Sequence, residues 1–423
     1  MKKYIIVVDR GSTNVKAVVF NTKAEVVLTT TYANPAAISP KPGWVELDLE
    51  ANWKSVAGAI KKVFNNDVKP EEVLGVMITG QGNGVTFIDK QGKSTSISSL
   101  DIRGVDMLNE WKADGRFPKA VELTGTVFNA SSAMPALAWL KKNARDVYDS
   151  IDTVMFIIDW MNYKLTGVIG TQWADVSGSG MMKLRDCKCD YAYDVLDLFG
   201  LEEIKTKLPP IQMCHEMRGT VTKEAAELTG LTEGTPVLSG IYDIAAFPYG
   251  IGSMNPREVV HAIGTWGISC RPAARIEECG ISTLYHPVPG YYVTGMGDSV
   301  AGCCLDFIMN TLCDHEKQEA EKKGMTVYQY VEDMIADREP TGILFQPYPF
   351  GNMFSKHAGA GFTGIRSWHT KADILRAVYE GIVMGYKTYC TLLADCDKCD
   401  VHWLIGGGAK SKVFGQMFAD IFG

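Results

Sequence analysis

The chain has 423 residues, of which 46% are hydrophobic, and its formal net charge is −7. This length suits two domains with sizeable cores, and the composition is that of an ordinary globular protein. The mildly acidic balance gives no reason to expect a nucleic acid or an anionic membrane as a partner. The apolar run at residues 4–8 is too short for a secretory signal, and no run approaches the ~20 residues of a membrane helix. We therefore expect a cytoplasmic protein.

The cysteines support the same compartment. Eleven cysteines are scattered along a chain without a secretory signal, which predicts reduced thiols. Four of them are closely spaced in pairs and could in principle hold zinc: Cys187, Cys189, Cys396 and Cys399. A second CxxC pair at ribbon spacing is absent, so we expect no zinc site.

A β-meander is predicted at the start of the chain, with short strands at residues 4–9, 17–20 and 26–32. The turn after the first strand is small and polar and is followed by a lysine; its members are Gly11, Ser12, Thr13, Asn14 and Lys16. Such residues offer backbone N–H groups and hydroxyls to a phosphate, and Asp9 before them can hold Mg²⁺. The same residues favour a plain hairpin turn, and this stretch alone leaves both interpretations open.

A glycine-rich turn follows the next predicted strand. A helix is expected at about residues 49–65 and a buried strand at residues 73–79. Three glycines then occur within residues 80–84, where Gln81 and Asn83 supply amide groups suited to a polyhydroxy ligand. A tight hairpin built on the Asn-Gly pair is the alternative.

The segment between this turn and the middle of the chain is predicted to be mostly helical. Asp101 and Arg103 precede a helix, another helix is expected at residues 159–167, and a short one at residues 223–229. Residues 175–180 read as a polar, glycine-rich loop.

Asp243 stands where the chain turns from a strand into a helix. Residues 235–238 predict a buried strand, Gly240 breaks it, and small apolar residues after Asp243 begin a helix. Open α/β folds bind their ligands at this kind of turn. A lone aspartate there is weak evidence, but glycine- and threonine-rich turns on both sides of it in sequence strengthen the case.

The second half repeats the design of the first. A strand at residues 258–263, the pair Gly264 and Thr265, and a strand at residues 268–271 repeat the strand, turn and strand of residues 4–21. This weak duplication predicts two related domains with a phosphate turn in each.

The end of the chain offers a second phosphate- or ring-binding loop. Helices are expected at residues 302–312, 326–336 and 371–393. A strand at residues 401–405 then leads into three glycines and a helix from about residue 412. Backbone without side chains lets a flat ring or a phosphate lie close, although the spacing is neither that of a P-loop nor that of a dinucleotide fingerprint.

Together and in this order, the motifs resemble those of the FGGY carbohydrate kinases of the actin-like ATPase superfamily, over essentially the whole chain. The matching segments are residues 9–16 and 264–265 (two phosphate motifs), 406–411 (adenosine motif), 42–46 (a frequent N-terminal segment) and 360–380 (the C-terminal signature). Each motif is weak alone, but their order makes the resemblance specific.

The resemblance implies an α/β fold of two actin-like (ribonuclease H-like) domains with a central cleft. Residues 1–243 would form the sugar-binding domain and residues 244–423 the ATP-binding domain. Family members usually continue for several dozen residues past the position of Gly423, so the C-terminal domain is expected to be truncated. A homodimer is the assembly that the family suggests.

The resemblance also assigns roles to residues. Asp243 falls on the family's catalytic base, and Asp9 on the position that holds Mg²⁺. The residues implied on the sugar side are Gln81, Gly82, Asn83, Asp101, Arg103 and Tyr242. The residues implied for ATP are Gly11, Ser12, Thr13, Asn14, Lys16, Gly264, Thr265, Gly407, Gly408, Ala409 and Lys410.

Positions 82 and 83 bear on the substrate. Glycerol kinases have Arg and Glu there and common D-xylulose kinases have Met and His, whereas this chain has Gly82 and Asn83. These residues and the Ile-Tyr pair before Asp243 look most like the L-xylulose kinase branch. The resemblance therefore implies ATP-dependent phosphorylation of a ketopentose, L-xylulose or a related pentulose or keto-sugar acid. The alternatives are another pentulose, a polyol such as erythritol or glycerol, a non-catalytic sugar sensor, and an actin-like assembly or chaperone ATPase.

Overall fold

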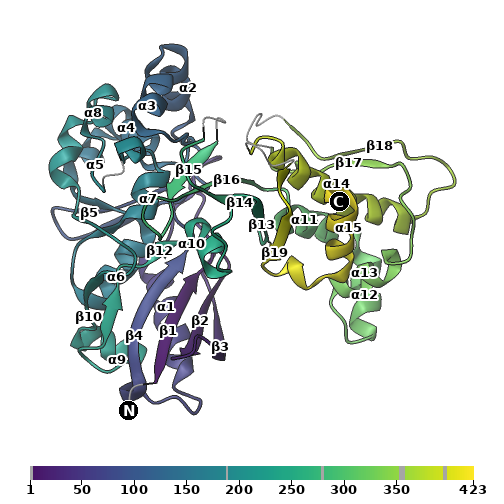
Figure 1. The fold of residues 1–423 in the computed structure, drawn as a ribbon, viewed down its shortest axis with the longest axis horizontal. Coiled ribbons are helices and arrows are strands. Elements are labelled where there is room, and N and C mark those ends of the chain that lie inside the picture. Colours follow the sequence, from purple (N-terminus) through teal and green to yellow (C-terminus); the bar gives the residue numbers. More distant parts are fainter. Residues whose placement is uncertain (1–2, 187–188, 278–280, 352–357, 394–397) are drawn as a thin grey trace. The chain divides into compact units, whose positions relative to one another are not determined.

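The computed structural model describes residues 3–186, 189–277, 281–351, 358–393 and 398–423 (Figure 1). The chain divides into two compact units. Unit 1 comprises Met1–Tyr249 and Ser282–Tyr292, and unit 2 comprises Gly250–Ile281 and Val293–Gly423. None of the helices in the described segments is long and apolar enough to cross a membrane.

Unit 1 is built on a sheet with strand order β10-β11-β4-β1-β2-β3, in which β12 also pairs with β4. Its strands are β1 (Tyr4–Arg10), β2 (Asn14–Asn21), β3 (Val26–Ala33), β4 (Val73–Gly80), β10 (Met217–Thr220), β11 (Pro236–Leu238) and β12 (Ile241–Tyr242). The first three strands form the predicted antiparallel meander, and β4 runs parallel to β1, β11 and β12.

Helices α1 (Leu49–Val63), α6 (Ile157–Thr166) and α9 (Lys223–Thr229) share one hydrophobic core with this sheet (Figure 1). Alternation along β1 buries Ile6 and Val8 in that core. The helix α1 begins where Asp48 accepts a hydrogen bond from the Ala51 N–H, an N-cap that fixes its start. The sheet and these helices therefore pack against each other through this shared core.

The rest of unit 1 includes a small sheet of order β6-β5-β7. Its elements are β5 (Val85–Asp89), β6 (Ser94–Ile97), α2 (Val105–Ala113), α3 (Arg116–Thr124), α4 (Ala133–Asn143), α5 (Arg145–Ser150), β7 (Ile151–Met155), β8 (Thr171–Gln172), α7 (Trp173–Gly178), α8 (Tyr193–Leu198), β9 (Ile211–Gln212), α10 (Asp243–Gly250) and β15 (Ser282–Tyr285), with 3₁₀ helices at Pro70–Glu72, Leu184–Asp186 and Glu202–Lys207.

Unit 2 contains a sheet in which β16, β14, β13 and β19 are neighbours in that order. Its elements are β13 (Glu258–Ile263), β14 (Gly267–Ala273), β16 (Tyr292–Asp298), α11 (Gly302–Leu312), α12 (Asp314–Lys322), α13 (Val327–Ile335), β17 (Leu344–Gln346), β18 (Gly361–Thr363), α14 (Lys371–Cys390), β19 (Val401–Ile405), a 3₁₀ helix at Gly408–Lys410 and α15 (Lys412–Phe422). Its main core lies among α11, α13, α14 and α15.

The two units repeat one arrangement of strands. In unit 1, β1 and β2 form an antiparallel hairpin and β1 also runs parallel to β4. In unit 2, β13 and β14 form the corresponding hairpin and β13 runs parallel to β19. A glycine-containing turn joins each hairpin, as the duplicated sequence pattern predicts.

One predicted loop is a helix. Residues 175–180 were expected to be irregular, but α7 spans Trp173–Gly178 and is wholly buried. The Gln172 side chain caps this helix by accepting hydrogen bonds from the Ala174 and Asp175 N–H groups. Burial against β15 then outweighs the low helix propensity of its Ser and Gly residues.

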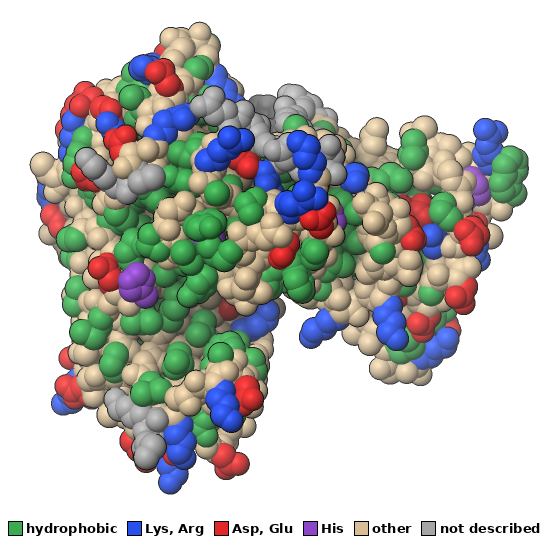
Figure 2. Space-filling model, viewed as in Figure 1, with side chains coloured by type: hydrophobic (Ala, Val, Ile, Leu, Met, Phe, Trp, Pro, Cys, Tyr) green, Lys and Arg blue, Asp and Glu red, His purple; other side chains and the backbone are tan. Residues whose placement is uncertain are grey.

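Charged side chains of both signs are mixed with neutral ones on the face shown in Figure 2. This distribution matches the small net charge of −7.

Candidate active site

Three parallel strands of unit 1 end at the same edge of its sheet. The register places Asp9 of β1, Thr79 of β4 and Ile241 of β12 side by side. Each strand ends one residue later, and Asp243 follows β12 directly. Ligands of α/β sheets bind at this edge, beyond the carboxyl ends of the strands.

A tight turn at Gly240 precedes β12 and Asp243. Gly240 has a φ of +86°, and a Cβ there would lie 2.3 Å from the Ile78 carbonyl oxygen. The Asn162 amide donates a 2.7 Å hydrogen bond to the Ser239 carbonyl. Glycine is required at this turn both for its left-handed backbone and for its lack of a side chain. The strand-to-helix turn predicted around Asp243 is confirmed.

Asp243 is a partly exposed first residue of α10 with an unusual acidity. Loss of surrounding water and, to a smaller extent, the nearby charge of Asp9 together raise its pKa to about 8. The Ile244 N–H and the Arg10 guanidinium oppose this shift. A carboxyl whose pKa is near neutral is suited to accept a proton from a hydroxyl.

Arg10 is a site residue that the sequence reasoning missed. Its side chain is buried and donates a 3.1 Å hydrogen bond from Nε to the Asn52 Oδ1 and a 3.0 Å bond from Nη1 to the Gln81 Oε1. Burial lowers its pKa to about 10, while Asp243 and Asp9 act in the opposite direction. It therefore remains a cation close to both carboxylates. The sequence did contain a signal, because the alternation that buries Ile6 and Val8 also places the charged Arg10 on the buried face of β1.

Both the oxygen and the nitrogen of the Gln81 side-chain amide form hydrogen bonds. Its Oε1 accepts from Arg10, and its Nε2 donates a 2.6 Å bond to the Ser99 hydroxyl. A small cavity of about 10 Å³, lined by both polar and apolar residues, adjoins it and has room for about one water molecule. The lining residues include Arg10, Gln81, Gly82, Asn83, Ser96, Ser98 and Ser99.

Gly82 and Asn83 lie against Asp175 and Tyr242. The Asn83 N–H donates a 2.5 Å hydrogen bond to the Asp175 Oδ1, and a Cβ at Gly82 would lie 2.3 Å from that oxygen and 2.4 Å from the Tyr242 ring. The buried Asn83 Oδ1 has no hydrogen-bond partner among the described residues. Buried acceptors usually have a partner, so this oxygen is a candidate to accept a hydrogen bond from a bound molecule.

The hairpin alternative for this turn is wrong. Asn83 and Gly84 do have positive φ values, +61° and +71°, as a tight Asn-Gly turn requires. The strands on either side, β4 and β5, nevertheless belong to different sheets.

Asp101 and Arg103 form a buried cluster with the loop before α1. The Arg103 Nη2 lies 2.8 Å from both the Asp101 Oδ2 and the Glu46 Oε1, and its guanidinium stacks 4.2 Å above the Trp44 ring. The Val45 N–H also donates to the Asp101 Oδ2. These partners use much of the pair's hydrogen-bonding capacity, and direct sugar contact by either residue stays a prediction.

The first candidate phosphate turn connects β1 and β2 of the N-terminal hairpin and is partly exposed. The Gly11 N–H donates a 3.0 Å bond to the Asn14 carbonyl, and Thr13 and Asn14 are exposed while Ser12 is half-buried. The Lys16 Nζ lies 3.9 Å from the Asp9 Oδ2. The Lys16 side chain is 54% and the Asp9 side chain 41% exposed, so this long ion pair contributes little to stability and leaves the lysine able to meet a phosphate.

The second set of candidate phosphate residues lies in unit 2. The register pairs Ala262 of β13 with Ile405 of β19, so Gly264 and Thr265 and the loop from Gly407 to Lys410 leave the same edge of the sheet. The first two N–H groups of α11 donate 2.9 Å bonds to the Gly264 and Thr265 carbonyls. A Cβ at Gly408 would lie 2.2 Å from the Ile263 side chain, which explains a glycine there.

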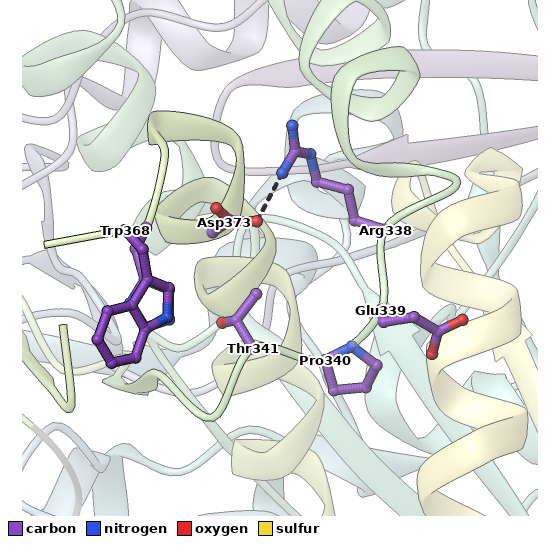
Figure 3. Close-up of a pocket in the computed structure, with 7 residues that line it drawn as sticks. Arg338, Glu339, Pro340, Thr341, Trp368 and Asp373 are labelled. Carbon is purple, nitrogen blue, oxygen red and sulfur yellow. Dashed lines mark hydrogen bonds and ion pairs between the residues drawn. The ribbon is translucent and has the colours of Figure 1, made fainter. Parts of the chain in front are cut away.

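Unit 2 has a hollow of about 350 Å³, and Figure 3 draws the residues that line it. Its lining residues are Arg338, Glu339, Pro340, Thr341, Trp368, His369 and Asp373. None of them is a predicted site residue. The Arg338 guanidinium donates a 2.6 Å bond to Asp373, which also caps α14, so these two side chains already have a structural role.

The described residues contain no preformed cluster of three or more metal-ligating side chains. Mg²⁺ usually binds one or two carboxylates together with substrate phosphates, so Asp9 beside Asp243 fits it without such a cluster. Of the four paired cysteines, Cys187 and Cys396 lie outside the described residues.

Two family models match the chain. The N-terminal domain of the FGGY family of carbohydrate kinases matches residues 4–248, and the C-terminal domain of the same family matches residues 259–423. The chain belongs to the FGGY family of carbohydrate kinases. The family predicted from the motifs is thereby confirmed, with its α/β fold and its activity as a carbohydrate kinase. Kinases of this family use ATP.

Two curated relatives align with nearly the whole length of this FGGY kinase. A probable L-xylulose kinase of Haemophilus influenzae is 27% identical over 99% of this chain and 86% of its own length. An L-xylulose/3-keto-L-gulonate kinase of Escherichia coli K12 is 29% identical over 92% of this chain and 77% of its own length. A ligand-bound xylulose kinase of Lactobacillus acidophilus has the same fold, with a TM-score of 0.85, 21% identity, and coverage of 99% of this chain and 84% of that one.

Proposed function

We propose that this carbohydrate kinase transfers the γ-phosphoryl group of ATP to a hydroxyl of a ketopentose, either L-xylulose or a related pentulose or keto-sugar acid. The named activities of the two curated relatives support this substrate class. The observation that carries the proposal is Asp243, a carboxyl of raised pKa at the ligand-binding edge of the sheet. The preceding residue, Tyr242, lies against Gly82 in the turn that contains Asn83, whose buried Oδ1 has no partner among the described residues.

Asp243 would take the proton of the sugar hydroxyl as that oxygen attacks the γ-phosphorus. The new bond joins the sugar oxygen to phosphorus, the bond to the bridging oxygen breaks, and ADP leaves. Because phosphoryl transfer depends on alignment and charge neutralisation, the protein's task is to hold these groups in place. Mg²⁺ bound near Asp9 would neutralise phosphate charge. Arg10 would keep the two carboxylates and Gln81 in fixed positions.

The proposed binding groups divide between the units. Gln81, Gly82, Asn83 and Tyr242 of unit 1 would contact the sugar, with Asp101 and Arg103 supporting their loop. The groups proposed for ATP are the turn from Gly11 to Lys16 in unit 1, and Gly264, Thr265 and the loop from Gly407 to Lys410 in unit 2. Residues 1–243 would thus serve the sugar and residues 244–423 chiefly ATP. A cytoplasmic homodimer is the assembly that fits the family.

The test is ADP release from Mg-ATP with a panel of pentuloses, hexuloses, 3-keto sugar acids and polyols. We expect one ketopentose or keto-sugar acid to drive turnover. Asp243→Asn should lose about 10²–10⁴-fold in turnover while sugar binding, measured by calorimetry, is retained. Asp67→Asn is the matched control, because Asp67 is an exposed carboxylate in the segment before β4, whose opposite end leads into the site.

Each outcome has a distinct meaning. Turnover with a polyol alone would replace the substrate and keep the kinase. Sugar binding without any ADP release by the folded wild type would indicate a sugar sensor instead. Near-normal turnover of Asp243→Asn would remove Asp243 from the mechanism.

A further inference from the structure

Asp175 is a buried carboxylate to which the reaction outlined above assigns no role. Its residue is only 1% exposed, in the middle of α7. One oxygen accepts the 2.5 Å bond from the Asn83 N–H, and the other accepts a 2.5 Å bond from the Gln172 Nε2. Among the described residues no Lys, Arg or His forms an ion pair with it.

Such a carboxylate is costly to keep. Removal from water raises the pKa of Asp175 well above its ordinary value, and the charges of Asp159 and Asp243 raise it further. A buried carboxylate without a cation opposes folding, and an apolar side chain would fill the space at lower cost. Its presence therefore points to the backbone that it holds.

That backbone is the turn predicted to bind the sugar. Asn83 adopts a φ of +61°, which is uncommon for a residue with a side chain, and its N–H is the group bonded to Asp175. The same conformation leaves the Asn83 Oδ1 buried and without a partner among the described residues. Strained residues of this kind persist where the surrounding structure forces them, often at binding sites.

The other side of Asp175 leads into a buried ion pair through Gln172. The Gln172 N–H donates a 2.9 Å bond to the Asp159 Oδ1, and the Thr171 hydroxyl donates 2.5 Å to the Asp159 Oδ2. Asp159 in turn lies 3.4 Å from the Arg218 Nη2, and both side chains are fully buried.

Arg218 ends the network at the turn before the proposed base. Its Nη2 donates a 2.8 Å bond to the Ser239 hydroxyl. Ser239 precedes Gly240, whose left-handed backbone begins the path to Asp243. The chain of hydrogen bonds thus connects the backbone of Asn83 with the turn that carries Asp243.

We propose that Asp175 is a positioning residue of the kinase: it fixes the Gly82–Asn83 turn, and through Gln172, Asp159 and Arg218 it holds that turn at a set distance from the Asp243 turn. The inference rests on the proposed function, in which Asn83 binds the sugar and Asp243 is the base. Gly82 is part of the device, because only a residue without a side chain lets Asp175 and the Tyr242 ring approach this turn so closely.

The test separates positioning from general stability by steady-state kinetics. In Asp175→Ala, with the sugar identified by the panel, we expect kcat/KM for the sugar to fall about 10²-fold, because a displacement near 1 Å costs that much. The KM for sugar should rise about tenfold, and the KM for ATP should change less than about twofold. Asp175→Asn keeps an oxygen for the Asn83 N–H but places an NH₂ donor against the Gln172 Nε2, so it should recover only part of the loss.

Asp373→Ala is the matched control. It removes a carboxylate that caps α14 in unit 2, so it should lower the unfolding temperature without changing the KM for sugar. Gly82→Ala disturbs the same contact from the opposite side while leaving Asp175 in place, and it should raise the sugar KM even if Asp175→Ala fails to fold.

Unchanged sugar kinetics in folded Asp175→Ala, or in Gly82→Ala where Asp175→Ala does not fold, would overturn the positioning role. That result differs from failure of the proposed function, in which the wild type itself releases no ADP with any sugar. In that event calorimetry of sugar binding to wild type and Asp175→Ala still decides the role of Asp175: equal affinities contradict it and weaker binding by the variant supports it.

Discussion

Asp243 combines a partly exposed position with a pKa raised to about 8 by loss of water and by Asp9. In the free enzyme it is therefore mostly protonated below that pH, whereas a base must be ionised to accept a proton. We expect kcat/KM for the sugar to rise with pH between about 6 and 9. A pH profile of kcat/KM reads this ionisation directly.

The raised pKa of Asp243 has the opposite effect on folding: it makes the protein less stable as the pH rises. An unfolded Asp releases its proton near pH 4, so between pH 4 and 8 the folded chain binds more protons at this site and loses stability as the pH rises. Asp243→Asn removes this dependence, and the difference in unfolding temperature between wild type and variant should grow toward pH 8. A kinetic midpoint near pH 4 with a constant difference would show an ordinary carboxyl.

At the scale of single elements, the turn between β11 and β12 requires a glycine on two grounds. A Cβ at Gly240 would meet the Ile78 carbonyl at 2.3 Å, and the φ of +86° is left-handed. Gly234 has a similar φ of +81° but open space around its Cβ position. Gly234→Ala should cost about 1 kcal/mol from the backbone alone, and Gly240→Ala should cost clearly more.

Denaturant unfolding of the two glycine variants measures this difference. Because the Gly240 turn carries Asp243, Gly240→Ala should also lower turnover, while Gly234→Ala should leave it unchanged. Equal losses of stability would mean that the contact with Ile78 relaxes at little cost.

For the whole molecule, we propose that the two units, which repeat one arrangement of strands, bind different ligands. Gly407 follows β19 and has nothing within 4 Å of its Cβ position, so Gly407→Val fits the folded protein and places a side chain where the nucleotide is predicted to lie. We expect this variant to lose the thermal stabilisation by Mg-ADP and to keep that by the sugar.

Asn83→Ala is the complementary variant for the same measurement. It removes the buried Oδ1 and should lose stabilisation by the sugar while keeping that by Mg-ADP. Loss of both stabilisations in Gly407→Val would contradict the division of ligands between the units.

Local pattern was sufficient for much of this protein. Apolar runs and turn residues predicted the two hairpins, the strand before Asp243 and the helices of unit 2 except α12, because these depend on periodicity within about 10 residues. The order of the short motifs was sufficient for the family. A residue such as Asp243 could be nominated because it stands at a strand-to-helix turn that is visible in the sequence.

Tertiary structure alone decided what surrounds Asp243. Asp175 accepts a hydrogen bond from the Asn83 N–H, which is 92 positions away in the sequence. The polar, glycine-rich residues around Asp175 predicted a loop, but burial of this segment produces the helix α7. Arg10 likewise acquires its role from Asn52 and Gln81, which no local pattern connects to it. Periodicity describes how a segment folds on itself, whereas burial and hydrogen bonding between distant segments set which polar side chains face the site and how acidic they are.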